Sequence, residues 1–117
     1  EKYEEVSLDD FVQYSRSMFE YWTEDDFASS FRKLLVIEQF RSVEMQALYQ
    51  QYLVAGPVGY VKDLFKSMGI KGTKKKAAQF YAIMFLYYSL YDGASDRKKI
   101  KKQFGQVISE FAKALQV

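Results

Sequence analysis

The sequence predicts a single all-α domain, built as a bundle of six helices. Apolar residues recur every three or four positions along most of the 117 residues, and no segment alternates in the manner of a strand. The chain has only one Pro and six Gly, some of which separate the periodic segments. A chain of this length suits one compact domain with short connections between its helices.

The first two expected helices follow capping residues and acidic first turns. Ser7 is expected to cap a helix over residues 8–22, and Thr23 a second helix that ends near Arg41. The apolar stripe of the first helix is Leu8, Phe11, Val12, Ser15, Met18, Phe19 and Trp22. The stripe of the second is Phe27, Phe31, Leu34 and Leu35, widened by Ile37 and Phe40.

The middle of the chain is expected to form two short helices separated by Gly-Pro. Ser42 is expected to cap a third helix over residues 43–55, which Gly56 ends. Pro57 suits the first turn of a fourth helix, because the N–H it lacks has no partner there. The fourth helix carries Val58, Val61, Leu64, Phe65 and Met68 on its apolar stripe.

The fifth helix, from Thr73 to about Tyr91, is apolar or aromatic almost all round. A helix of this kind needs cover on every side, and we expect its own domain to cover one side and a second molecule the other. A tight turn at residues 92–94 leads to a sixth helix capped by Ser95, which should pack antiparallel to the fifth. Two copies of this pair would form a four-helix homodimer interface. Its expected residues are Tyr81, Phe85, Tyr91, Phe104, Ile108 and Phe111.

Two other interpretations of the fifth helix are open. It could be the central helix of a monomeric bundle. A membrane-spanning role is disfavoured, because the apolar stretch contains Gln79 and Ser89 and is shorter than the roughly 20 residues that a bilayer requires.

Composition excludes several kinds of chemistry. The chain contains no Cys and no His, which excludes thiol nucleophiles, disulfides, Ser-His-Asp triads and Cys/His zinc sites. Glu38 and Glu44 are the only carboxylates expected inside the bundle, so we expect neither an enzyme nor a metal or other cofactor. Nothing resembles a signal peptide, and we expect a cytoplasmic protein.

The aromatic content, 18% of the residues, favours a ligand pocket among the first five helices. Pockets between helices are mostly apolar with a few polar groups, and buried Tyr and Trp need partners for their polar atoms. The alternative is that these side chains only fill a core. The expected pocket residues are Phe11, Tyr14, Ser15, Met18, Trp22, Phe31, Gln39, Tyr49, Tyr52, Phe65, Phe80, Met84 and Tyr88.

Two clusters of basic residues stand near the fifth and sixth helices. One is Lys71 with residues 74–76, and the other lies within residues 97–102. Contact with nucleic acid is one interpretation, but a solvated face is favoured, since the formal net charge is only +2.

Two stretches resemble TetR/AcrR-type transcriptional regulators. One is LLVIEQFRS at residues 34–42, and the other is FYAIMFLYYSLYDGA at residues 80–94, which is similar to the penultimate helix and turn of many C-terminal domains in that family. The resemblance implies an effector-binding and dimerisation domain over residues 1–117. It also implies a dimer through residues 73–91 and 95–117, and a cavity for a small hydrophobic or aromatic effector.

In such regulators DNA is bound by an N-terminal helix-turn-helix domain. No segment here has that pattern, so we expect the DNA-binding domain to precede Glu1 and the effector to modulate it. The alternative is a stand-alone helical dimerisation or interaction domain that binds no small molecule.

Overall fold

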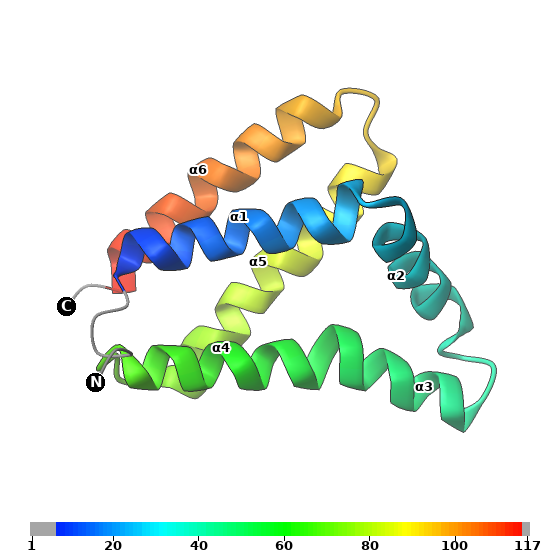
Figure 1. Ribbon diagram of the computed structural model, residues 1–117, viewed down its shortest axis with the longest axis horizontal. Coiled ribbons are helices and arrows are strands. Elements are labelled where there is room, and N and C mark those ends of the chain that lie inside the picture. The colour runs from blue at the N-terminus through cyan, green and yellow to red at the C-terminus, as the bar shows by residue number, and fades with distance from the viewer. Residues whose placement is uncertain (1–6, 116–117) are drawn as a thin grey trace.

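A computed structural model describes residues 7–115, and within that range the chain is all-helical (Figure 1). The elements are α1 (Leu8–Glu24), α2 (Asp26–Glu38), α3 (Val43–Tyr49), a π-helical segment η2 (Gln50–Ala55), α4 (Gly56–Ser67), α5 (Thr73–Gly93) and α6 (Arg97–Leu115). The prediction of an all-α fold is confirmed.

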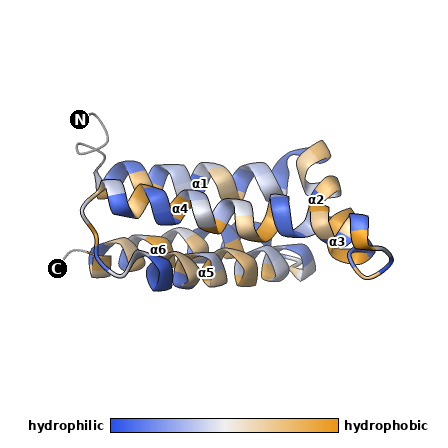
Figure 2. Cartoon of the chain, turned by 90° about the horizontal axis from the view of Figure 1, so that it is seen from below, coloured by the Kyte–Doolittle hydropathy of each residue, from blue (hydrophilic) through white to orange (hydrophobic). Residues whose placement is uncertain are grey.

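The helices form two layers. Figure 2 shows α1 and α4 in one layer and α5 and α6 in the other. α5 packs against α1, α4 and α6, which makes it the central helix of the molecule. α2 and α3 lie at one end and pack mainly against α1 and each other (Figure 1). Within the described residues, no helix combines the length and apolar character needed to cross a membrane.

The expected boundary between the third and fourth helices is wrong, because α3, η2 and α4 run on without a break. Pro57 has no N–H, and in a regular α-helix its ring would meet the carbonyl group four residues earlier. The chain widens into a π-helix just before this point instead of ending. Gly56 permits the wide turn, since a Cβ at this position would overlap the carbonyl oxygen of Gln51. The described residues therefore form five continuous helical segments rather than six.

The starts of the helices follow short polar side chains, though not always those expected. The caps at Ser7 and Ser42 are confirmed, because each hydroxyl accepts a hydrogen bond from the backbone N–H three residues later. Thr23 caps nothing: its hydroxyl donates to the carbonyl of Phe19 at 2.6 Å, inside α1. Asp25 caps α2 in its place, accepting from the N–H of Ala28.

The C-terminal end of α2 and the start of α6 also differ from expectation. α2 ends at Glu38 rather than near Arg41. α6 begins at Arg97, where Asp96 and not Ser95 accepts a hydrogen bond, from the N–H of Lys99 at 3.2 Å. These shifts move the boundaries by one to three residues and leave the order of the helices unchanged.

The core is aromatic and sits where α1, α4, α5 and α6 meet. The Phe19 ring stacks on Phe104 with 4.2 Å between centroids, and both side chains are buried. A second, smaller cluster of Leu35, Tyr49 and Leu53 joins α2 to α3 and η2. Side chains from both clusters line an aromatic cleft between α1, the η2–α4 junction and α5.

α2 faces the core with a different side from the one expected. Phe27, Leu34, Ile37 and Phe40 are exposed, with exposed fractions from 50% to 85%. The inner face carries instead Ala28, Arg32 and Leu35, at spacings of four and three. The expected stripe was therefore right for Phe31 and Leu35, which pack in the smaller cluster, and wrong for the other four residues, because a buried arginine occupies part of the inner face.

Candidate functional site

An aromatic cleft lies between α1, the η2–α4 junction and α5. Its lining includes seven of the expected pocket residues, namely Tyr14, Met18, Trp22, Tyr52, Phe80, Met84 and Tyr88. Spacing brings them together: on α1 and on α5 the lining residues recur every four positions, on one side of each helix. Leu53, Pro57, Val61 and Tyr81 complete the lining.

The cleft is tightly closed. The free volume among its side chains is about 10 Å³, which is room for about one water molecule. Sites for drug-sized ligands are roughly 300–1,000 Å³. A ligand would therefore have to separate the helices that line the cleft. Because η2 departs from regular α-helical hydrogen bonding, its junction with α4 is the natural place for that movement.

Three expected pocket residues lie deeper in the core, and the one polar side chain among them forms its hydrogen bond there. The rings of Phe11 and Phe65 pack at 5.1 Å from each other and are fully buried outside the cleft. Ser15 donates its hydroxyl hydrogen bond to the carbonyl of Phe11 at 2.8 Å. These residues share the helix faces that were expected, but they fill the core rather than line the cleft.

Three further expected pocket residues lie around the smaller cluster. Tyr49 is buried with Leu35, and Phe31 packs against that cluster. The amide of Gln39 donates to the carbonyl of Val36 and accepts from the amide of Gln46 at 3.1 Å. Gln39 therefore ties the α2–α3 connection together, outside the cleft.

Tyr81 has an unsatisfied hydroxyl group. Its Oη is the one buried side-chain polar atom without a hydrogen-bond partner among the described residues. A buried hydroxyl left unpaired costs about 1–3 kcal/mol. Burial raises the pKa of this phenol, as does Tyr49 nearby. Tyr81 was expected in a dimer interface, but it lines the cleft, where it offers a hydrogen bond to any group that enters.

Two other phenols of the cleft, those of Tyr14 and Tyr88, are also kept protonated by burial. Burial, and secondarily the neighbouring Tyr60, raises the pKa of Tyr14 to about 12. Burial also raises the pKa of Tyr88, against the opposing effect of Arg32. The Arg32 guanidinium lies 4.9 Å from the centroid of the Tyr88 ring. The cleft is thus mainly apolar, and its buried phenols of Tyr14, Tyr81 and Tyr88 stay protonated at neutral pH.

Arg32 joins three helices at one edge of the cleft and was missed by the sequence analysis. Its side chain is 4% exposed and binds Asp92 through two hydrogen bonds, of 3.0 and 2.7 Å. Its Nε also donates to the carbonyl of Trp22 at 2.9 Å. A signal was present in the sequence, since Arg32 lies on the same helical face as Ala28 and Leu35.

Several expected dimer-interface residues are already covered by the chain itself. Tyr91, Phe104 and Ile108 are 9%, 1% and 0% exposed, and Phe111 is half-buried in the same core. The apolar stripe of α6 is used against α1 and α5. These side chains offer a partner little surface, which corrects their expected placement at an interface.

α5 nevertheless has an uncovered outer face. Phe85, Leu86 and Leu90 are 41%, 53% and 42% exposed, and Phe85 is the expected interface residue that remains accessible. The other exposed positions on this stretch of α5 are uncharged, namely Ala78, Gln79, Ala82 and Ser89. We call these seven residues the α5 outer face. An open groove of about 490 Å³ connects it to α2 through Ile37.

The charged residues singled out in the sequence lie on the surface. Lys71, Lys74 and Lys75 are exposed around the start of α5. Glu44 is exposed, and Glu38 pairs with the exposed Arg41 at 3.0 Å. Neither carboxylate faces the cleft.

Comparisons with protein-family models, with curated proteins and with solved structures find no match to this chain.

Proposed function

We propose that this chain is the effector-sensing and dimerisation domain of a TetR/AcrR-type transcriptional regulator. A small apolar or aromatic effector enters the aromatic cleft and alters DNA binding by a helix-turn-helix domain outside residues 1–117. One observation carries the proposal: α5 lines the cleft with one side and exposes an uncharged apolar face on the other. The resemblance of residues 80–94 to the penultimate helix of such domains supports it.

The dimerisation part rests on the α5 outer face. Fully burying a Leu or Phe side chain contributes about 1.5–3 kcal/mol, so covering Phe85, Leu86 and Leu90 in both copies favours association by several kcal/mol. α5 has 21 residues and is about 30 Å long, which sets the greatest length of a two-fold contact along it.

The sensing part of the proposal rests on α5, which lines the aromatic cleft on one side and carries the α5 outer face on the other. An effector that widens the cleft must displace the inner side of α5 or the helices opposite it. A shift of α5 also moves its outer face, and so the relative placement of two copies. The effector then favours one of two arrangements by its differential affinity for them.

A ligand screen tests this function. Trp22 lines the cleft and is the only Trp in the chain, so apolar and aromatic compounds that enter should change its fluorescence and raise Tm. Tyr81→Phe keeps the shape of the side chain and removes the unpaired hydroxyl. This variant should bind compounds that carry a hydrogen-bonding group more weakly and bind purely apolar compounds with unchanged affinity.

A second candidate is favoured by the closed state of the cleft. With about 10 Å³ of free volume, the domain could dimerise without binding a small molecule. A dimer that shows no change in Trp22 fluorescence and no shift in Tm with any compound would favour this candidate and contradict the sensing role.

A further inference from the structure

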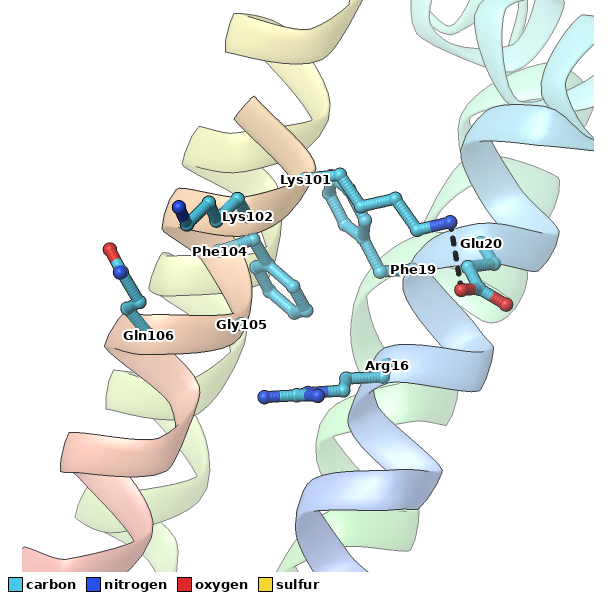
Figure 3. A pocket seen from close by; sticks show the side chains of 8 residues that line it. All are labelled: Arg16, Phe19, Glu20, Lys101, Lys102, Phe104, Gly105 and Gln106. Atoms are coloured by element: carbon cyan, nitrogen blue, oxygen red, sulfur yellow. Dashed lines mark ion pairs between the residues drawn. The ribbon is translucent and has the colours of Figure 1, made fainter. Parts of the chain in front are cut away.

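A second hollow lies between α1 and α6, on the other side of the core from the aromatic cleft (Figure 3). Its volume is about 310 Å³, at the lower end of the range for small-molecule sites. The stacked rings of Phe19 and Phe104 form its floor, where each side chain is only 1% exposed. The hollow therefore has the size of a ligand site and a narrow apolar floor.

Arg16 reaches across this hollow from α1 to α6. Figure 3 shows its guanidinium extending toward the backbone of α6 at Gly105. A Cβ at position 105 would lie 3.2 Å from Nη2 of Arg16, and the next two nearest atoms also belong to the Arg16 guanidinium, at 3.4 Å. The glycine thus lets the guanidinium rest on the helix. Among residues 7–115, no carboxylate lies within ion-pair distance of Arg16.

The neighbouring charges leave an excess of positive charge in the hollow. Lys101 bonds to Glu20 at 2.9 Å and to Glu24 at 3.0 Å, so both carboxylates are engaged by the same ammonium group. The hydrogen bonds that the ammonium donates to Glu20 and, secondarily, to Glu24 raise the pKa of Lys101. Lys102 also lines the hollow and has no ion-pair partner among the described residues.

We propose that this hollow binds a small oxyanion, a carboxylate or a phosphate, carried on an apolar group. The guanidinium of Arg16 has the planar fork that pairs with such oxygens, and Lys102 adds a second positive charge. The apolar part of the ligand lies on the Phe19–Phe104 floor. This site is separate from the aromatic cleft and does not depend on the proposed regulatory function.

Calorimetric titration tests the site with benzoate and phenyl phosphate, which share a ring and differ in the oxyanion. Neutral benzamide is the matched probe without charge. Arg16→Gln should lower the affinity for either anion about tenfold or more, because charge-assisted hydrogen bonds are lost. Gly105→Ala should also weaken it by displacing the guanidinium, while circular dichroism shows an intact helical fold.

Lys113→Gln is the control variant, since it removes one positive charge from α6 outside the hollow. It should leave the affinity unchanged. Binding of either anion with this pattern supports the site and identifies the oxyanion it prefers. Equal binding of benzamide, equal affinity in Arg16→Gln and wild type, or no binding of either anion at millimolar concentration would overturn it.

Discussion

Arg32 illustrates how one polar residue can set the position of a helix. Its guanidinium is buried at the junction of α1, α2 and α5, where Asp92 and the carbonyl of Trp22 satisfy it. Burying a charge is tolerated only when it is paired and hydrogen-bonded. This pairing explains why α2 turns Arg32 inward and leaves Phe27 in solvent.

Asp92→Ala tests the importance of this pair. The substitution leaves the Arg32 guanidinium buried without its counter-charge and should lower the free energy of unfolding by about 2–3 kcal/mol. Asp63→Ala removes an exposed aspartate from α4 and should change it by no more than about 0.5 kcal/mol. Urea denaturation measures both, and equal effects of the two variants would contradict a structural role for the Arg32–Asp92 pair.

The neutral phenols of the cleft predict a loss of stability at high pH. The pKa of Tyr14 is 10.0 when unperturbed and about 12 in the fold, so between these values the unfolded chain has released a proton that the native state retains. The free energy of unfolding is therefore unaffected by this group below pH 10 and falls as the pH rises toward 12.

Denaturation at a series of alkaline pH values measures this slope. Tyr14→Phe should make it shallower, because that proton no longer contributes. Titration of the phenolate absorbance should show late-ionising tyrosines in the native protein that are lost in denaturant. An unchanged slope in Tyr14→Phe would contradict the burial of this phenol.

At the scale of the helices, much of the fold could be predicted from the sequence and some of it could not. The periodicity of α1, α5 and α6 and the caps at Ser7 and Ser42 depend on local physics, and they were identified correctly. The inner face of α2 depends on Asp92, sixty residues from Arg32, which the local pattern does not reveal. The continuity of α3 with α4 depends on a local π-helical turn between Gln51 and Gly56, which apolar periodicity does not reveal either.

The candidate site follows the same division. The residues that line the cleft from α1 and α5 were found because helical spacing places them on one side. Leu53, Pro57 and Val61 were not among the expected pocket residues, and the expected break at Gly56 separated Leu53 from the other two. Phe104 and Ile108 were placed at an interface but are buried within the chain, because periodicity reveals an apolar face but not which element covers it.

A pair of glycine variants tests the π-helical segment. Gly56→Ala introduces a Cβ that overlaps the Gln51 carbonyl and should destabilise the protein by about 1–3 kcal/mol. Gly59→Ala, one turn later, meets nothing within 4 Å and should stabilise α4 by up to about 1 kcal/mol through helix propensity. Chemical denaturation distinguishes the two, and stabilisation by both would show that the wide turn at Gly56 is not required.

At the scale of the whole molecule, α5 connects the cleft with the surface. It touches α1, α4 and α6 through its buried side, yet its stretch from Ala77 to Tyr91 contains no charged residue on any side. A helix at the surface of a monomer would ordinarily carry polar residues on its exposed face. The proposed dimerisation therefore requires a second copy of the chain to cover the α5 outer face.

Sedimentation equilibrium tests that claim most directly. The wild-type chain should behave as a species of twice its 13.7 kDa mass, and Leu86→Glu should convert it to the monomer. Tyr60→Glu on α4 is the matched control, since Tyr60 is 54% exposed and Leu86 53%, and this variant should remain dimeric. A wild-type chain that stays at 13.7 kDa at all concentrations, or dissociation by Tyr60→Glu as complete as that by Leu86→Glu, would contradict the account.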